Sequence, residues 1–578
     1  MSVVAPWELR FEAFVCDDFG LAADRPDHGV VAAGGVGPHQ LHAWDRRTGD
    51  LRTLTDSPAG VLAGWISADG AWVYYLDDDG GTEEGHLVRV NFDGGTPERV
   101  DASGGPAGLF DLVAFGDQIA FTLARAGQYE HRVAKNSVPG SRLIAKDNVA
   151  SFIGGFVDQG RTVVVSRYLA DGGRDTQLVD VATGGVMAQL GIPGFALIAY
   201  LGSPVEGDRR LLAESNETGF RRPFVWDPEV DTREPIPVDG MAGEVRPIAW
   251  SPDAQSVLLL QTTRAEMHLH LQDLATGARR RLPLPAGAIT GLPISFATEF
   301  GSSTEVLTLW QDGTHPRSIV SIPLDGRPPS TLLGSALDGS GHPWRNVTFP
   351  SADGTPIQGW LSTPDGPGPF RAVVDVHGGP GVAQFDEFLP HLQAFVDSGF
   401  AVLSVNYRSS GTFGREFEHA IQGHPGELEV DDLAAAHGYL VGEGIARSGD
   451  VLLEGWSYGG YLTLMGLGRR PDLWAGGICG VGIGDTPSLM DEAVEDIRQM
   501  FIAVFGGTPD ELPGRYVAAS PMSYVEAVDA PLLVIHGRDD GRCPAGQMER
   551  YLDRMAELDK DVTTEWFSAG HLGGVANP

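Results

Sequence analysis

A glycine-rich segment, GWSYGG at residues 455–460, contains a single serine, Ser457. It directly follows the apolar run VLLE and precedes the stretch YLTLMGL, which has the character of a helix. A GxSxG pattern between a strand and a helix is typical of a nucleophile elbow, in which the glycines allow a sharp turn that exposes the serine hydroxyl. The helix N-terminus beside it favours the negative charge that develops during acyl transfer. The pattern predicts that Ser457 is a nucleophile.

A serine hydroxyl is a poor nucleophile unless a base, itself oriented by a carboxylate, takes its proton. In this type of sheet the partners follow the serine in the order Asp or Glu, then His. Asp540 follows the apolar strand PLLVIHG, and His571 follows the strand TTEWF. Both therefore lie at carboxyl ends of strands, where an open α/β sheet places its site. We predict a triad of Ser457, Asp540 and His571, with Asp539 as the alternative to Asp540.

Acyl transfer also needs hydrogen-bond donors for the oxyanion of the tetrahedral intermediate. One donor is the amide of the residue after the nucleophile, here Tyr458. The second is expected from the loop HGGPG at residues 377–381, which directly follows the apolar strand AVVDV. Two glycines there let the backbone approach a substrate closely. The plainer alternative is an ordinary glycine–proline turn.

The segments that must position these residues lie after about residue 345. A hairpin is predicted at 347–361. Strands are predicted at 372–376, 401–407, 451–454, 476–481, 531–537 and 563–567, and helices near 386–397, 427–442 and 545–558. Strands that alternate with helices and are nearly continuous apolar runs indicate a parallel sheet covered on both faces. This half is predicted to be an α/β-hydrolase domain.

The first half of the chain consists of short strands between Gly, Asp and Pro turns. A strand that ends in Asp, followed by a turn with Thr-Gly, recurs at residues 45–49, 180–184 and 273–277. Repeats of about 40–50 residues built from four strands indicate a β-propeller. Counting strand clusters predicts seven blades, with two stacked β-sandwiches as the alternative.

Composition and charge exclude several classes of protein. The net charge is −36 and the longest basic cluster is Arg279-Arg280-Arg281, so a nucleic-acid partner is not expected. No stretch of 18 apolar residues and no basic leader is present, and only three cysteines occur, so we expect a cytoplasmic protein without a membrane partner. No HExxH, CxxC or phosphate-loop motif is found, and no metal or other cofactor is expected.

Taken together, these motifs resemble the prolyl oligopeptidase family of serine peptidases, and within it the acylaminoacyl peptidases. The segments that carry the resemblance are DGTPIQGWL (353–361), HGGPG (377–381), NYRSSGTFG (406–414), GWSYGG (455–460), SPMSYV (520–525), HGRDDGRCP (536–544) and AGH (569–571). The resemblance covers essentially the whole chain. It implies a propeller followed by an α/β-hydrolase domain. Family members carry a closing helix after the catalytic histidine, whereas this sequence ends shortly after His571.

The resemblance also assigns roles to individual residues. The amides of Gly379 and Tyr458 would form the oxyanion hole. His377 stands where prolyl oligopeptidase itself has a tyrosine, which favours the acylaminoacyl branch. Arg542 matches an arginine that contacts the acyl end of the substrate in acylaminoacyl peptidases, although a surface or ion-pair role is the alternative. No pair of glutamates could be assigned as an amine clamp, which argues against a dipeptidyl peptidase.

From these observations we expect three parts: an N-terminal segment (1–21) that packs on the hydrolase domain, a propeller (22–342) and the hydrolase domain (343–578). The expected function is hydrolysis of short or N-acylated peptides through an acyl-enzyme intermediate. A hydrolase or acyl-transfer enzyme that tailors a peptide-like small metabolite is the alternative, because it would use the same triad. A non-catalytic binding propeller is disfavoured by the complete triad. The oligomeric state, a homo-oligomer included, stays open.

Overall fold

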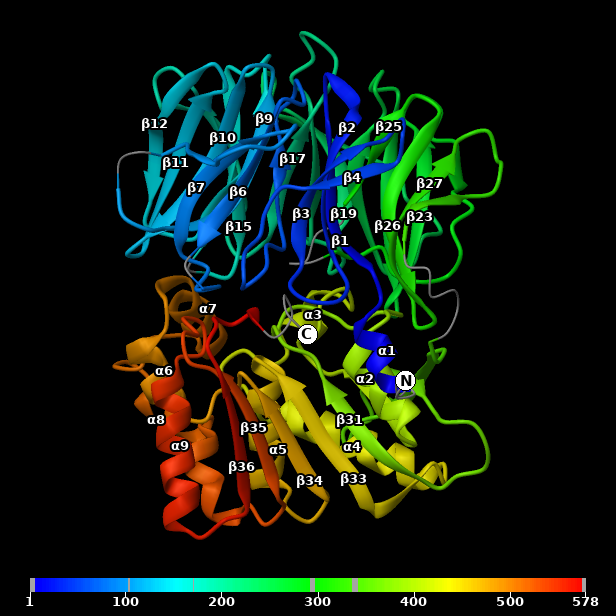
Figure 1. The fold of residues 1–578 in the computed structure, drawn as a ribbon, viewed down its shortest axis with the longest axis vertical. Helices are drawn as coiled ribbons and strands as arrows, with labels where there is room; N and C mark the ends of the chain where they lie inside the picture. The colour runs from blue at the N-terminus through cyan, green and yellow to red at the C-terminus, as the bar shows by residue number, and fades with distance from the viewer. Residues whose placement is uncertain are drawn as a thin grey trace. The chain divides into compact units, whose positions relative to one another are not determined.

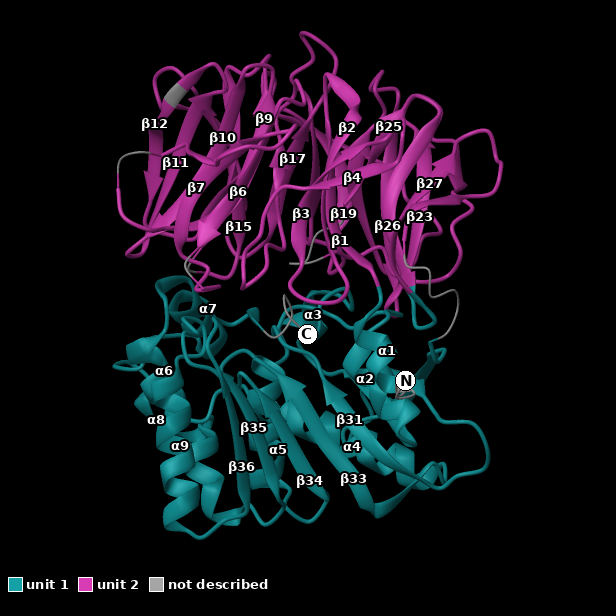
Figure 2. Cartoon of the chain, in the orientation of Figure 1, with its two compact units in different colours: residues 1–13, 312–315, 337–574 teal, residues 14–311, 316–336, 575–578 magenta. Residues whose placement is uncertain are grey.

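The computed structural model describes residues 6–78, 80–101, 104–169, 171–291, 297–334 and 341–573. The chain forms two compact units (Figure 2). Unit 1 comprises residues 1–13, 312–315 and 337–574, and unit 2 comprises residues 14–311, 316–336 and 575–578. The expected boundaries at residues 21/22 and 342/343 stay a prediction.

Unit 2 is a β-propeller of seven four-stranded antiparallel sheets, which confirms the predicted fold of the first half (Figure 1). Each blade is built from four strands that are consecutive in the chain. The blades are β1 (Val15–Ala22), β2 (Arg25–Gly34), β3 (Gln40–Asp45), β4 (Asp50–Thr53); β5 (Trp65–Ile66), β6 (Trp72–Asp78), β7 (Gly85–Asn91), β8 (Glu98–Arg99); β9 (Gly108–Phe115), β10 (Gln118–Arg125), β11 (Gln128–Lys135), β12 (Val138–Asp147); β13 (Ser151–Val157), β14 (Thr162–Tyr168), β15 (Arg174–Asp180), β16 (Val186–Leu190); β17 (Leu197–Gly202), β18 (Leu211–Ser215), β19 (Arg222–Asp227), β20 (Thr232–Pro235); β21 (Glu244–Trp250), β22 (Ser256–Thr263), β23 (Glu266–Asp273), β24 (Arg279–Arg281); β25 (Thr298–Ser302), β26 (Glu305–Asp312), β27 (His315–Pro323), β28 (Ser330–Leu333).

The recurring Asp…Thr-Gly sequence closes the hairpin between the third and fourth strands of three blades. Asp180 accepts hydrogen bonds at 2.7 Å from both the backbone N–H and the hydroxyl of Thr183. Asp273 makes the same pair of contacts with Thr276, at 2.8 and 2.6 Å. Gly184 then has a φ of +73°, which suits glycine. A short side chain that hydrogen-bonds nearby backbone therefore sets each turn.

The ring is closed between the first and last blades by side chains, because no described strand pairs across that seam. Residues of both blades form one apolar cluster, made up of Cys16, Phe19, Val31, Ala33, Trp44, Leu307, Leu309 and Ile319. Beside it, Arg317 of β27 donates a 3.1 Å hydrogen bond to Asp17 of β1. Apolar packing and a buried ion pair thus take the place of a shared strand.

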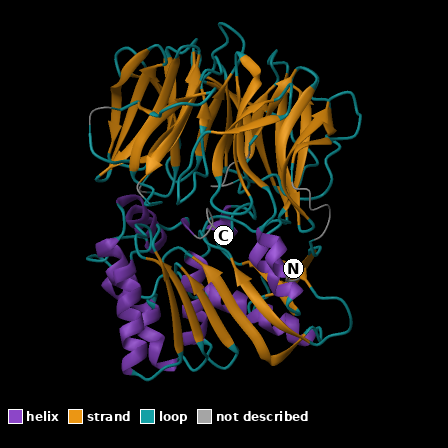
Figure 3. Ribbon diagram, in the orientation of Figure 1, coloured by secondary structure: helices purple, strands orange, loops and turns teal. Residues whose placement is uncertain are grey.

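Unit 1 contains an eight-stranded sheet and all of the described helices (Figure 3). The strands are β29 (Arg345–Pro350), β30 (Pro356–Ser362), β31 (Phe370–Val376), β32 (Phe400–Asn406), β33 (Ala446–Trp456), β34 (Gly476–Gly480), β35 (Leu532–Gly537) and β36 (Val562–Phe567). The helices are α1 (Pro6–Phe11), α2 (Pro390–Asp397), α3 (Arg415–Glu418), α4 (Leu428–Gly442), α5 (Tyr458–Arg469), α6 (Thr486–Glu492), α7 (Glu495–Phe505), α8 (Pro513–Ala518), the 3₁₀ helix η1 (Pro521–Ala527) and α9 (Ala545–Glu557).

The sheet order is β29-β30-β32-β31-β33-β34-β35-β36. The first two pairings are antiparallel, and from β32 and β31 onward the strands are parallel. Every predicted strand and helix of this half is present, which confirms the α/β-hydrolase fold. The inner strands β31, β32 and β34 are nearly all buried, as expected for a sheet with helices on both faces, whereas the edge strand β36 is largely exposed.

Six of the described helices were not predicted from the sequence. The helices α6, α7, α8 and η1 lie between β34 and β35, where no element was expected, and the short α3 lies between β32 and α4. The sixth is α1, within the N-terminal segment. Its Arg10 donates two hydrogen bonds, of 2.8 and 2.9 Å, to the carboxylate of Asp397 at the end of α2. None of the described helices is both long and apolar enough to cross a membrane.

Candidate active site

Ser457 is the single residue between strand β33 and helix α5, as expected for a nucleophile elbow. Its backbone has φ of 59° and ψ of −120°, a conformation that costs free energy for a residue other than glycine. The turn needs the flanking glycines, because a Cβ at Gly459 would overlap the carbonyl oxygen of Val376 and one at Gly455 would meet the backbone of Gly459. Backbone sterics therefore account for the GxSxG spacing.

The structure brings His571 and Asp540 to Ser457, although they are far apart in the sequence. The Nε2 atom of His571 lies 3.0 Å from the hydroxyl of Ser457, and its Nδ1 atom lies 2.7 Å from Oδ2 of Asp540. Because a carboxylate can only accept, Nδ1–H donates to Asp540 and the lone pair on Nε2 faces the serine. This arrangement lets His571 take a proton from Ser457.

Backbone donors hold the carboxylate of Asp540 in place. Its Oδ1 accepts hydrogen bonds from the amides of Arg542 at 2.9 Å and Cys543 at 2.8 Å, which leaves Oδ2 for His571. Asp540 is buried, whereas Asp539 is exposed. The geometry therefore favours Asp540 over its neighbour as the group that orients the histidine.

The loop HGGPG lies beside the nucleophile, at the end of β31. A Cβ added at Gly378 would lie 3.3 Å from Cβ of Ser457 and 3.9 Å from its hydroxyl oxygen, so this backbone runs against the serine. The next residue, Gly379, has a φ of +132°, which side-chain-bearing residues rarely adopt. The amide of Tyr458 belongs to the first turn of α5, where helix N–H groups have no partner within the helix. Both amides predicted for the oxyanion hole thus belong to backbone that borders Ser457.

Two side chains from outside this loop, Tyr407 and Ser410, contact its His377, and neither was singled out in the sequence. The buried Tyr407 donates a 2.9 Å hydrogen bond to the carbonyl of His377 and stacks on its ring, with 4.4 Å between ring centroids. The ring nitrogens of His377 lie 2.7 Å from the carbonyl oxygen of Gly378 and 2.8 Å from the hydroxyl of Ser410. Burial lowers the pKa of His377 to about 4, so the ring is neutral near pH 7. Residues of the NYRSS segment therefore hold the loop in place through His377.

A buried carboxyl group, Glu429 of α4, contacts the side chain of Tyr458, whose amide is predicted to belong to the oxyanion hole. It accepts a 2.8 Å hydrogen bond from the hydroxyl of Tyr458 and two 3.0 Å contacts from the amide of Gly426. Burial raises its pKa from 4.5 to about 7, against the lowering effect of these hydrogen bonds. Glu429 is thus a titrating group next to the site, and no local sequence signal points to it.

We expect Glu429→Gln to change how stability depends on pH. Because the pKa is raised in the folded state, both states are protonated well below pH 4.5, and between about pH 4.5 and 7 only the unfolded state loses its proton. The wild-type free energy of unfolding should therefore fall over this window, by about 3 kcal/mol at most, and glutamine removes that loss. In thermal melts, the melting temperature of the variant relative to that of the wild type should be higher at pH 8 than at pH 5. The exposed neighbour Glu427→Gln is the control, and a pH-independent difference for Glu429→Gln would contradict the assignment.

Arg542 lies two residues after Asp540, in the loop between β35 and α9. Its amide donates to Asp540, and its side chain is half-buried. The backbone contact ties its position to the triad whatever the side chain does.

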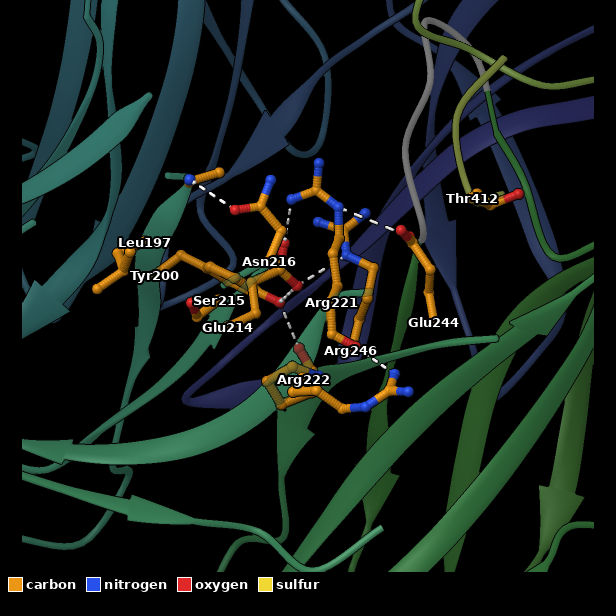
Figure 4. Close-up of polar contacts among 12 residues, drawn as sticks. Leu197, Tyr200, Glu214, Ser215, Asn216, Arg221, Arg222, Glu244, Arg246 and Thr412 are labelled. Carbon is orange, nitrogen blue, oxygen red and sulfur yellow. Dashed lines mark hydrogen bonds and ion pairs between the residues drawn. The ribbon is translucent and has the colours of Figure 1, made fainter. Parts of the chain in front are cut away.

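The propeller contains a buried ionic cluster around Glu214 (Figure 4). Arg221 donates to Oε1 of Glu214 at 2.9 Å, and Arg246 and Tyr200 donate to Oε2 at 2.8 and 3.3 Å. Although burial raises the pKa of Glu214, the two arginines hold it below its usual value. Arg221 also lies 3.6 Å from Glu244. The charge of Glu214 is already compensated by these two arginines, so this carboxylate does not offer a free partner for a substrate amine.

Comparison with known proteins identifies the family of the C-terminal region. Residues 387–577, which include Ser457, Asp540 and His571, match the model described as the prolyl oligopeptidase family. Dipeptidyl aminopeptidase BIII of Pseudoxanthomonas mexicana is 32% identical over 215 residues, covering 36% of this chain and 31% of that protein. The acylamino-acid-releasing enzyme of Homo sapiens is 27% identical over 334 residues, covering 52% of this chain and 44% of that protein. The matches thus span about a third to under half of these relatives' length.

The structural comparison extends over both units. A puromycin-hydrolyzing peptidase of Mycobacterium tuberculosis aligns with a TM-score of 0.84 at 17% identity, covering 100% of this chain and 94% of that one. At this identity the likeness shows the fold, a propeller with an α/β-hydrolase domain. Residues 387–577 of this chain are a prolyl oligopeptidase family domain.

Proposed function

We propose that this protein is a serine peptidase that hydrolyses short or N-acylated peptides through an acyl-enzyme intermediate. The observation that carries the proposal is the unbroken relay from the hydroxyl of Ser457 through His571 to Asp540, with contacts of 3.0 and 2.7 Å. Such an arrangement activates a serine for attack on a carbonyl carbon. The family of the domain gives the class of bond, an amide of a peptide or a related acyl compound.

The proposed reaction has two halves. Nε2 of His571 takes the proton of Ser457 as the hydroxyl oxygen attacks the substrate carbonyl, and the amides of Gly379 and Tyr458 stabilise the resulting oxyanion. The protonated histidine then gives its proton to the leaving amine, which leaves an ester on Ser457. A water molecule, deprotonated by His571, hydrolyses that ester. Asp540 keeps the ring in the required tautomer and stabilises its cationic form.

A hydrolase or acyl-transfer enzyme for a peptide-like small metabolite is the second candidate, because every group above would serve it equally.

We also propose a cytoplasmic location, which the three unpaired, buried cysteines support.

The two candidates differ in substrate range. The test is a panel of chromogenic amides with free and N-acetylated termini, short peptides, simple esters and puromycin, which is the substrate named for the structural neighbour. The peptidase proposal expects the highest kcat/KM on peptide amides. If turnover is confined to puromycin or simple esters, the second candidate is the better one.

The role of Arg542 gives a separate prediction. If its guanidinium binds the acyl carbonyl, Arg542→Ala should raise KM for N-acetylated peptides about tenfold or more and leave kcat nearly unchanged, as expected for one lost charged hydrogen bond. Arg538→Ala is the matched control, because Arg538 lies in the same loop but is exposed and stacks on Trp566. Equal effects of the two variants, or equal effects on free and acetylated substrates, would assign Arg542 a structural role.

A further inference from the structure

Two acidic residues lie side by side in the core of unit 1, on the sheet face that α2 covers. Asp375 of β31 and Glu454 of β33 are register partners on neighbouring parallel strands. They alternate in phase with Val373 and Leu452, which pack in the apolar cluster beneath α2. His391, the second residue of α2, lies over the same place, so one ligand atom from each of Asp375, Glu454 and His391 falls within 4.8 Å of the others.

Neighbouring side chains orient both carboxylates. The hydroxyl of Ser404 donates to Oδ2 of Asp375, and the indole N–H of Trp456 donates to Oε1 of Glu454 at 2.8 Å. The other oxygen of Glu454, Oε2, is buried and has no hydrogen-bond partner among the described residues. A buried oxygen without a donor costs free energy, so its environment calls for a positive partner.

These two carboxylates have no basic partner among the lysines and arginines that the structure describes. Asp375 and Glu454 are 5% and 2% exposed, and neither forms an ion pair with a described lysine or arginine. Two ionised carboxylates with oxygen atoms less than 4.8 Å apart repel each other strongly in a low-dielectric core. A proton shared between them would cancel one of the two charges but would leave the facing imidazole without a role. A divalent cation would neutralise both carboxylates and would be bound by all three side chains.

We propose that Asp375, His391 and Glu454 bind one divalent transition-metal ion of the Zn²⁺ type. One imidazole nitrogen and two carboxylate oxygens are ligands that suit Zn²⁺. They disfavour Mg²⁺ and Ca²⁺, which prefer oxygen ligands alone. The hydrogen bonds from Ser404 and Trp456 are the outer contacts that hold such ligands in position. The ion would join α2 to β31 and β33, the two strands that lead into the HGGPG loop and Ser457. It takes no part in the proposed peptide hydrolysis.

The experiment is metal binding by the full chain after removal of bound metal with a chelator. Equilibrium dialysis against Zn²⁺ and Co²⁺ should give one tightly bound ion per chain, and the melting temperature should rise with the metal concentration. Glu454→Gln and His391→Gln, each nearly isosteric, should weaken binding at least tenfold. His342→Gln is the matched control, because His342 makes a 2.8 Å contact with Asp397 of α2 but belongs to no group of three ligand-type side chains among the described residues.

Each outcome decides the proposal. A wild-type chain that binds no Zn²⁺ or Co²⁺ overturns it and leaves the shared proton as the explanation. Retained binding in folded Glu454→Gln and His391→Gln variants also overturns it and moves the ion elsewhere, for example to His571. Should either variant fail to fold, anomalous scattering at the zinc edge from crystals of the wild type locates the ion directly, and a peak away from these three side chains counts against the site.

Discussion

Ser457→Ala should reduce kcat on a peptide amide by about 10⁴- to 10⁶-fold and leave the fold intact. In the proposed mechanism the hydroxyl oxygen of Ser457 forms the acyl-enzyme, and no other described hydroxyl lies within hydrogen-bonding distance of Nε2 of His571. Removing it also removes little packing, because the elbow is held by the backbone of Gly455, Gly459 and Val376 rather than by the serine side chain. The measurement is kcat and kcat/KM on one chromogenic amide, together with a thermal melt.

A matched control is Ser410→Ala, which removes a hydroxyl near the same loop. Ser410 lies 2.8 Å from a ring nitrogen of His377 and donates to the carbonyl of Tyr407, so its loss should disturb the loop without abolishing acylation. A fluorophosphonate probe should label the wild type and Ser410→Ala but not Ser457→Ala. A folded Ser457→Ala protein that keeps near-normal turnover would refute the nucleophile assignment.

The nucleophile elbow could be predicted from the sequence because its causes are local. The elbow is one contiguous segment: the strand VLLE, the glycines at 455 and 459, and the helical stretch after them. At the two glycines any side chain would overlap backbone atoms. The propeller was predictable for a similar reason, since each Asp…Thr-Gly turn is closed by contacts within four residues. Local hydrogen bonds and backbone conformation leave a signature in the order of residue types.

Features that depend on strand pairing left no such signature. Asp375, His391 and Glu454 are spread over 80 residues, and they meet only because β31 pairs in register with β33 while α2 crosses that face. Glu429 reaches Tyr458 from a different helix, 29 residues earlier. The helix α7 differs, because it does carry a local signal that our prediction overlooked: Ile497, Met500, Phe501, Val504 and Phe505 have the i, i+3, i+4, i+7, i+8 spacing of an amphipathic helix.

The Asp540→Asn variant should lower kcat by about 10⁴-fold, and the contacts of Asp540 explain why. Oδ1 accepts from the amides of Arg542 and Cys543, so the oxygen of an asparagine would be held at that position. Its NH₂ group would then face Nδ1 of His571, where the carboxylate now accepts at 2.7 Å. Nδ1 would have to become the acceptor, and the proton would move to Nε2, which could no longer take a proton from Ser457.

The comparison with Asp539→Asn tests which of the two adjacent carboxylates orients the histidine. Asp539 is exposed, and its side chain makes no hydrogen bond to His571, so its change to asparagine should alter kcat by less than about threefold. Both variants are isosteric and remove one negative charge from the same loop, which makes the general electrostatic effect common to them. If Asp539→Asn produced the large loss and Asp540→Asn the small one, Asp539 would be the third member of the triad. Equal, modest losses would mean that neither carboxylate sets the tautomer of His571, and the relay that carries the proposed function would have to be abandoned.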